Sequence, residues 1–214
     1  MLLKRTNMLG RIAFQLNEVK QTLGVQKLSL LDIGGGKGFG LQELGKRPDI
    51  DYHVLDLATR HTTPEVTFHQ GDITDPGLSL GQKFDVIFTK DTYEHILNPW
   101  DSTMNILALL KNGGRFIFLA PFSWRYHSSP YDTFRYTHTG ARYLFERLGG
   151  MQCIETAYIP FGDVGGFWKN RKDHTMDGHP FPKCLETYYV AKRIDGFEFD
   201  KATLDIDLSD YHTE

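Results

Sequence analysis

The sequence predicts an α/β fold whose core is a mostly parallel, seven-stranded sheet with an antiparallel last strand. Three observations lead to this expectation. Seven strand-like runs alternate with helix-like segments, the first run at residues 28–33 is apolar enough to be buried on both faces, and the last two runs are joined without a clear helix. With 214 residues, 40% of them hydrophobic and 24% charged, the chain can bury the core of one domain.

The elements follow from local patterns. Apolar side chains at spacings of three and four predict a lead helix over residues 6–23, which Gly24 ends. The later elements are expected, in order, as strand 28–33, helix 41–46, strands 52–57, 66–69 and 84–89, helix 102–110 with Asp101 as its cap, strand 115–120 after Asn112–Gly114, helix 140–148 capped by Thr137 or Thr139, and strands 152–158 and 185–192. Long loops are expected at residues 121–137 and 160–183. One domain over residues 1–194, with residues 1–24 as lead helix, is the economical interpretation.

Charge and composition exclude several classes of protein. The net charge of −3 combines −6 in an acidic tail, residues 195–214, with +3 in the rest, which is far from the clustered positive charge of a nucleic-acid-binding domain. The longest apolar stretch, 116–122, is too short for a membrane helix, and the N-terminus does not read as a signal peptide. Two cysteines form no disulfide framework, so we expect a cytoplasmic protein.

A glycine cluster follows the first buried strand. Gly34, Gly36 and Gly38 let the backbone turn closely beneath a ligand and lead into the N-terminus of a helix. Their spacing does not match a G-x-G-x-x-G dinucleotide fingerprint, and no Gly-Lys-Ser/Thr triplet of a phosphate loop is present. The spacing therefore argues against a dinucleotide and a nucleoside triphosphate as the ligand, and a tight turn without a ligand is the structural alternative.

The pattern Asp32-x-Gly34-x-Gly36-x-Gly38 resembles motif I of the class I S-adenosylmethionine-dependent methyltransferases. This resemblance implies a Rossmann-like sheet with helices on both faces and S-adenosylmethionine as cofactor. It also implies that Asp56 holds the ribose hydroxyls and that Asp72 meets the adenine amino group. The cofactor-binding residues that it implies are Asp32, Gly34, Gly36, Gly38, Asp56, Leu57, Asp72, Ile73 and Thr89.

Residues after the fourth strand resemble the small-molecule branch of that family. Tyr93-Glu94-His95 is similar to its fourth-strand motif, and Leu110–Arg115 is similar to its turn into strand five. The Asn/Asp-Pro-Pro-Tyr/Phe motif of enzymes that methylate base amines is absent, since Lys90-Asp91-Thr92-Tyr93 stands there. Nucleic acid is therefore not the expected acceptor.

Candidate acceptor-side residues lie in loops after strands, where open α/β sheets bind ligands. The catalytic candidates are Asp91, His95 and His127, since a hydroxyl acceptor must lose a proton. The substrate-binding candidates are Tyr93, Arg125, Tyr131 and Arg135. Structural alternatives remain open: Glu94 and His95 brace a turn, Asp132 and Arg135 pair with each other, and the loop cations form a solvated surface. The irregular spacing of His174, His179 and Cys184 predicts no metal site.

Together these observations predict an enzyme that O-methylates a small polar acceptor, namely a sugar, a glycan precursor or a phosphorylated metabolite. The excess of cations in the loops favours an anionic acceptor. The alternatives are an N-methyltransferase acting on a small amine or a protein, and a non-catalytic cofactor-binding partner subunit. No membrane association is expected, and a homodimer is compatible with the sequence.

Overall fold

In the computed structural model, the described residues are 8–36, 40, 47–58, 64–124, 126–127, 130–160, 175–176, 179–180 and 185–197. The elements are α1 (Met8–Leu23), β1 (Leu28–Ile33), β2 (Ile50–Asp56), β3 (Val66–Gln70), β4 (Phe84–Lys90), the 3-10 turn η2 (Tyr93–His95), α3 (Pro99–Leu109), β5 (Leu110–Ser123), α4 (His138–Glu146), β6 (Met151–Pro160), β7 (Thr175–Met176), β8 (His179–Pro180) and β9 (Leu185–Arg193). The helix predicted at residues 41–46 lies outside the described residues.

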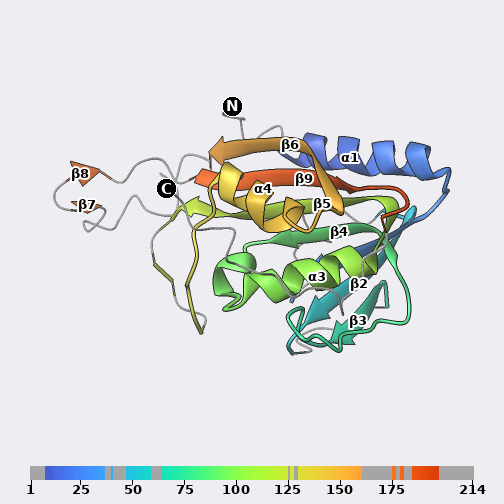
Figure 1. The fold of residues 1–214 in the computed structure, drawn as a ribbon, viewed down its shortest axis with the longest axis horizontal. Helices are drawn as coiled ribbons and strands as arrows, with labels where there is room; N and C mark the ends of the chain where they lie inside the picture. Colours follow the sequence, from blue (N-terminus) through green and yellow to red (C-terminus); the bar gives the residue numbers. More distant parts are fainter. Residues whose placement is uncertain are drawn as a thin grey trace.

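Seven strands form one twisted sheet in the order β3-β2-β1-β4-β5-β9-β6 (Figure 1). All neighbouring pairs from β3 to β5 are parallel, and β9 runs antiparallel to both β5 and β6. The predicted sheet, with its antiparallel last strand, is confirmed. The short antiparallel pair β7 and β8 lies within the long loop expected at residues 160–183.

Helices cover both faces of the sheet, as predicted (Figure 1). Alternate residues of each strand face opposite sides. Leu30 belongs to the buried cluster that contains Ile12 and Leu16 of α1. The next residue, Leu31, belongs to the cluster of the other face, together with Phe145 of α4. Both faces of the central strands are therefore sealed from water, which explains why they read as continuous apolar runs.

Two helix starts were predicted differently. α3 begins at Pro99 with Asn98 at the N-cap position, so Asp101 lies in the first turn rather than at the cap. Proline has a fixed φ that suits the first helical position, and this moves the start three residues earlier. α4 begins at His138, and of the two predicted caps it is Thr137 whose side chain accepts a hydrogen bond from the backbone nitrogen of Gly140.

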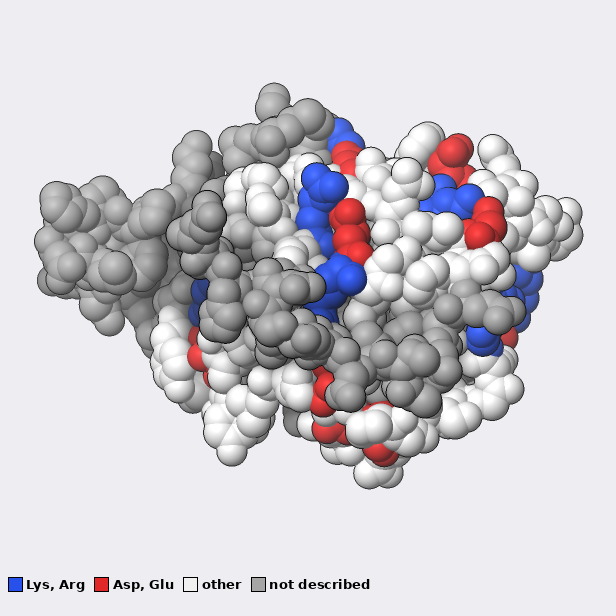
Figure 2. All heavy atoms as spheres, in the orientation of Figure 1, with Lys and Arg blue, Asp and Glu red and all other residues white. Residues whose placement is uncertain are grey.

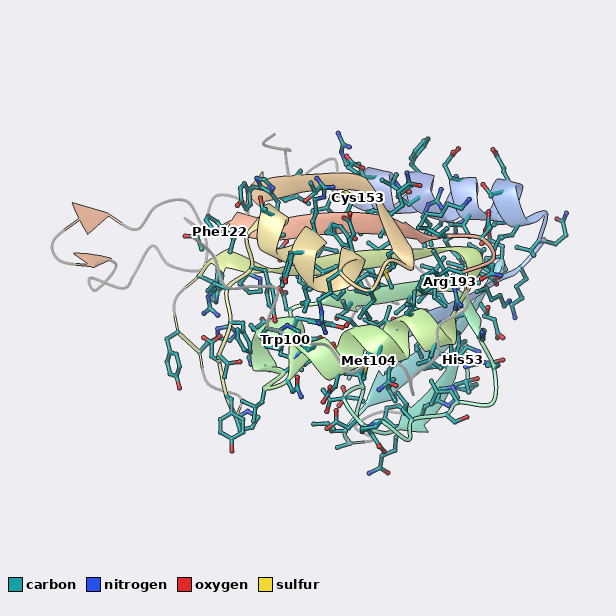
Figure 3. All side chains as sticks on the ribbon, viewed as in Figure 1. His53, Trp100, Met104, Phe122, Cys153 and Arg193 are labelled. Carbon is teal, nitrogen blue, oxygen red and sulfur yellow. The ribbon has the colours of Figure 1, made fainter. Side chains whose placement is uncertain are left out.

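The carboxyl ends of the parallel strands meet at one edge of the sheet. Ile33, the last residue of β1, pairs with Leu55 of β2 and with Thr89 of β4, so the three strands end almost in line. Trp100 at the start of α3 and Phe122 near the end of β5 lie at this same end of the molecule (Figure 3). This alignment brings the loops after β1, β2 and β4 to one place.

Within the described part of the chain, no helix combines the length and the apolar character that a bilayer crossing requires. On the face seen in Figure 2, acidic and basic side chains of the described residues lie beside one another rather than in a broad patch of one sign.

Candidate cofactor and acceptor site

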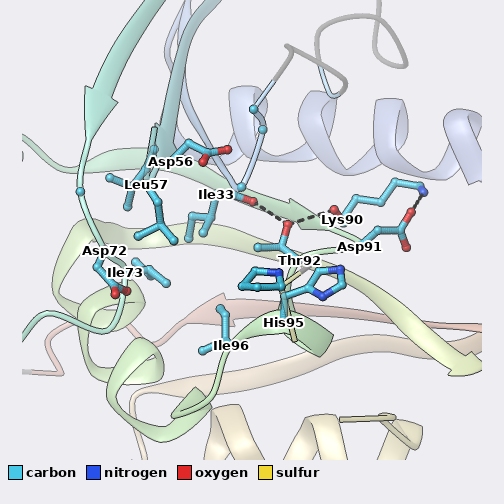
Figure 4. A pocket seen from close by; sticks show the side chains of 16 residues that line it. Ile33, Asp56, Leu57, Asp72, Ile73, Lys90, Asp91, Thr92, His95 and Ile96 are labelled. Carbon is cyan, nitrogen blue, oxygen red and sulfur yellow. Dashed lines mark hydrogen bonds and ion pairs between the residues drawn. The ribbon is translucent and has the colours of Figure 1, made fainter. Parts of the chain in front are cut away.

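A cavity of about 540 Å³ opens where β1, β2 and β4 end (Figure 4). Its lining comes from six short segments, namely residues 33–36, 55–57, 71–73, 90–92, 95–96 and Pro130. Asp56, Leu57, Asp72 and Ile73 lie on one side, and Lys90, Asp91 and His95 lie on the other (Figure 4). The cavity is thus bounded by a glycine turn, an acidic side and a side with groups able to accept a proton.

The glycine turn passes closely over Thr92. Gly34 has φ +73°, and a Cβ placed on it would lie 2.9 Å from the Thr92 Cβ and closer still to its Oγ1. The Thr92 hydroxyl is held by hydrogen bonds to the carbonyl oxygens of Ile33 (3.2 Å) and Lys90 (3.1 Å). Gly36 also has a positive φ of 37°, whereas Gly38 lies outside the described residues. Only glycine fits at position 34, because both the backbone angle and the space exclude a side chain.

Asp32 lies beneath the glycine turn rather than in the cavity. Its side chain is buried, accepts a hydrogen bond from the Tyr52 hydroxyl, and contacts the positions of Gly35 and Gly40 so closely that neither could carry a side chain. Burial raises the pKa of Asp32 to about 7. Asp32 therefore shapes the turn from below, and its carboxylate does not line the cavity.

The acids predicted to hold the ribose and the adenine both line the cavity. Asp56 ends β2, and its Oδ2 would lie 3.1 Å from a Cβ placed on Gly36. Asp72 accepts hydrogen bonds at Oδ1 from the backbone nitrogen and the hydroxyl of Thr74, both at 2.8 Å, which fixes the direction of its other oxygen. Leu57, 65% exposed, and the buried Ile73 supply apolar surface beside these acids.

Thr89 and Tyr93, two further predicted site residues, are buried away from the cavity. Thr89 is fully buried in β4 and donates to the carbonyl oxygen of Ile33 at 3.2 Å. Tyr93, predicted to bind substrate, is buried among Phe118, Tyr136 and Phe145, and Ser102 donates to its hydroxyl. The 3-10 turn at residues 93–95 directs Tyr93 into the core and His95 toward the cavity, so the aromatic ring anchors the turn instead of meeting an acceptor.

The three catalytic candidates come together beside the cavity. Asp91, with φ +51°, lines it and is paired with Lys90, whose Nζ also lies 3.2 Å from the Glu186 carboxylate of β9. His95 lines the cavity, and the centroid of its ring lies 5.1 Å from that of His127. These side chains form an acceptor-side cluster at the end of β4.

Hydrogen bonds attach the loop before α4 to η2, beside this cluster. Thr133 donates through its backbone nitrogen to the carbonyl oxygen of Glu94 at 2.7 Å, and Tyr136 donates to the carbonyl oxygen of Tyr93 at 3.0 Å. Arg135 pairs with Asp132 (Nη2 to Oδ2, 2.7 Å), and its hydrogen bonds lower the pKa of Asp132 to about 2. Arg135 is therefore engaged within the loop, as the structural alternative in the sequence predicted.

Tyr131 is not among the residues that line the cavity. Tyr131 is 53% exposed, and its carbonyl oxygen contacts His95 Nδ1. Arg125 lies outside the described residues, as do His174 and Cys184; the side chain of His179 is also not described.

Three groups were missed as site residues. Glu94, weighed only as a turn brace, is fully buried, and neither carboxylate oxygen has a hydrogen-bond partner in the described part of the chain. Burial, followed by the charge of Asp91, raises the pKa of Glu94 to about 8. Burial and the same carboxylate raise the pKa of Glu186 to about 7. Glu186 comes near Lys90 through strand pairing across the sheet, so no local sequence pattern could have identified Glu186 as a site residue. No sequence pattern pointed to Thr92 either.

A family model for the methyltransferase domain matches residues 7–154. The chain belongs to this methyltransferase family. The match runs from α1 into the first residues of β6 and includes every segment that lines the cavity.

A curated relative is the ubiquinone biosynthesis O-methyltransferase of Coxiella burnetii, 25% identical over 143 residues that cover 63% of this chain and 58% of the relative. The chain thus spans less than two thirds of that relative's length. Two solved structures share the fold. A proposed sarcosine dimethylglycine methyltransferase from Galdieria sulphuraria superposes with TM-score 0.63 at 14% identity, covering 89% of this chain and 86% of that one. Phosphoethanolamine N-methyltransferase 2 of Haemonchus contortus, in complex with S-adenosyl-L-methionine, superposes with TM-score 0.55 at 16% identity, covering 86% of this chain and 53% of that one.

S-adenosylmethionine is the cofactor of this methyltransferase domain, and the described residues fit it. A turn at Gly34 and Gly36 leaves open backbone where a bulky side chain would fill the space. Asp56 offers two acceptor oxygens to vicinal hydroxyls, and Asp72 offers an oxygen to an amino group. When bound, this cofactor supplies a methyl carbon attached to a positively charged sulfur.

Proposed function

We propose that the protein transfers this methyl group to a hydroxyl oxygen of a small polar acceptor such as a sugar or a glycan precursor. The observation that carries the proposal is the composition of the cavity, which joins the cofactor-side acids Asp56 and Asp72 to the acceptor-side cluster with Asp91 and His95. A hydroxyl nucleophile must lose a proton on methylation, and carboxylate and imidazole groups are suited to accept it. The O-methyltransferase relative supports the same choice.

In this proposal, Asp56 and Asp72 hold the ribose and the adenine, and the glycine turn lies beneath the methionine part. Asp91, His95 and His127 are the proton-accepting candidates, since they gather where the acceptor enters. Tyr131, exposed on the loop before α4, offers a ring face against which a sugar could stack. Positioning of the nucleophile in line with the methyl carbon provides most of the rate acceleration.

A neutral acceptor is favoured over a phosphorylated one. The described cations nearest the cavity are already engaged, Lys90 with Asp91 and Glu186, and Arg135 with Asp132. An anionic acceptor would have to displace one of these carboxylates. The loop lysines and arginines that led to the expectation of an anionic acceptor, Arg125 among them, lie outside the described residues, so that expectation stays a prediction.

The test incubates the protein with S-adenosylmethionine carrying a deuterated methyl group and with separate panels of neutral sugars, phosphosugars and amines. We expect a labelled ether from a neutral hydroxyl compound, detected by mass spectrometry. A labelled amine as the dominant product would instead establish the N-methyltransferase alternative. Cofactor binding without any labelled product would favour the non-catalytic partner subunit.

A further inference from the structure

The buried carboxylate of Glu94 faces two imidazoles. Its Oε1 lies 3.7 Å from His95 Nε2 and 3.7 Å from His127 Nε2, and one ligand atom of each residue lies within 4.8 Å of the others. Three groups that bind metals well, from η2 and from the loop after β5, thus point at a common centre. We propose that Glu94, His95 and His127 bind a divalent transition-metal ion at the acceptor side of the cavity.

The state of Glu94 supports a cation. Its side chain is fully buried, and in the described part of the chain neither oxygen receives a hydrogen bond. A buried carboxylate without hydrogen bonds is costly, and an absent ion is one of the ordinary explanations for such a group. A cation at this centre would compensate the charge that no described donor satisfies.

Both imidazoles are oriented as metal ligands are. The Nδ1 atom of His95 contacts the carbonyl oxygen of Tyr131, and the Nδ1 atom of His127 lies 3.2 Å from Asp132 Oδ2. A hydrogen bond at Nδ1 fixes the tautomer in which Nε2 carries the lone pair, the arrangement common among metal-binding histidines. Asp132 is itself held by Arg135, so the orientation of His127 is supported through a second layer of contacts.

The spacing suits a small ion. Metal-to-ligand distances of about 2.1 Å in a tetrahedral site place ligand atoms about 3.4 Å apart. The observed separations of 3.7 Å would close to this value by small side-chain rotations. Two imidazoles and one carboxylate form a donor set used by zinc and related ions, and three protein ligands leave a position for an oxygen from water or an acceptor.

The location gives the ion a role, which rests on the proposed function. His95 lines the cavity, so the open position would face the space in which the acceptor sits. A divalent ion lowers the pKa of a hydroxyl oxygen that binds it. With both imidazoles acting as ligands, Asp91 is left among the three candidates to accept the acceptor's proton.

The test measures metal binding directly. Protein without an affinity tag is freed of metal by a chelator and titrated with Co²⁺ by visible absorption and with Zn²⁺ by calorimetry. We expect one ion per chain, with absorption bands of low-symmetry Co²⁺. Glu94→Gln and His127→Ala should each weaken binding by more than about 100-fold, because even the loss of an outer partner costs roughly 10- to 100-fold. His138→Ala removes an imidazole outside the cluster and should leave binding unchanged.

The readings separate this inference from the proposed function. Absence of stoichiometric binding by the wild type, or binding undiminished in both Glu94→Gln and His127→Ala, would refute the metal site. Melting curves of the metal-free variants identify loss of fold. If Glu94→Gln does not fold, the test rests on His127→Ala, because the side chain of His127 is partly exposed. S-adenosylhomocysteine calorimetry and the labelled-methyl assay are run in parallel. Metal binding without methyl transfer would contradict only the proposed function, whereas metal-independent methyl transfer by a protein that binds no ion would contradict only this inference.

Discussion

Gly34 is the residue at which backbone geometry and close contact coincide. Its φ of +73° and the proximity of Thr92 both exclude a side chain. We expect Gly34→Ala to lower stability by more than the roughly 1 to 2 kcal/mol that a left-handed backbone costs an alanine, because Thr92 must also move. Gly81→Ala is the matched control, since Gly81 has φ +71° with no atom near its Cβ position. Equal losses for the two variants, measured by urea denaturation, would contradict a close contact at Gly34.

Asp56 tests the cofactor side of the cavity. Replacing it by alanine should cost about 1 to 3 kcal/mol of cofactor binding, the range for hydrogen bonds to a charged group. Calorimetry with S-adenosylhomocysteine measures this directly. Asp75→Ala removes the carboxylate of an exposed residue that does not line the cavity, and the affinity of this variant for the cofactor product should match that of the wild type. If the two variants bind equally well, the ribose contact assigned to Asp56 is wrong.

Asp32 gives a pH dependence with a defined sign. Burial raises its pKa from 3.8 to about 7, so between these values the folded state holds a proton that the unfolded state has lost. Its contribution to stability is complete below about pH 4 and is lost as the pH rises to about 7, by up to about 1.4 kcal/mol per pH unit. The stability of wild type relative to Asp32→Asn should therefore fall over this range. Urea unfolding at several pH values checks this, and parallel curves would show that Asp32 does not titrate there.

At the scale of elements, the N-terminus of α4 offers a pair of matched threonines. The Thr137 hydroxyl accepts from the Gly140 nitrogen at 2.9 Å, whereas Thr139 lies in the first turn and is exposed. Thr137→Ala should lower the free energy of unfolding by about 1 kcal/mol, and Thr139→Ala should change it much less. Chemical denaturation of both variants decides this. A larger loss of unfolding free energy for Thr139→Ala than for Thr137→Ala would show that Thr137 is not the cap.

The elements show what a sequence can reveal and where it stops. β1 and β4 were predicted because burial on both faces leaves long apolar runs. The glycines follow β1 directly, and Asp56 was predicted from its place at the end of the second strand, so both could be proposed from the sequence. The cluster of Glu94, His95 and His127, at which we propose a metal ion, could not be predicted in this way, because His127 lies 32 residues beyond His95 and reaches it only through the fold. The prediction that Tyr93 binds the acceptor was wrong, although Tyr93 is close to His95 along the chain. Closeness along the chain does not show which side chains of a 3-10 turn face the core and which face the cavity.

At the scale of the whole molecule, we propose that residues 1–194 form one domain, followed by an acidic tail. The first residues of this tail contact the domain, since Phe197 packs beside the core and its carbonyl oxygen accepts from Arg193 at 3.2 Å. The two core clusters lie on opposite faces of one sheet and share every central strand, so neither can unfold without exposing the other.

This arrangement predicts a single cooperative unfolding transition. S-adenosylhomocysteine should raise the free energy of unfolding by about 2.7 kcal/mol at a concentration 100 times its dissociation constant, since only the folded state presents the cavity. Far-ultraviolet circular dichroism and tryptophan fluorescence should report the same midpoint, with and without ligand. Two separate midpoints would show that the chain contains two independent units.

The position of β9 also constrains how the protein is made. This strand is inserted between β5 and β6, although both of those strands precede it in the sequence. While a ribosome is still producing residues 161–184, β5 and β6 have been made but β9, which pairs with both, has not. Each of the two strands then has an edge of unpaired backbone N–H and C=O groups. Such edges are sites at which nascent chains pair with one another. The half of the sheet at which the cavity opens can assemble early during translation, and the half that carries Glu186 is completed only when β9 emerges.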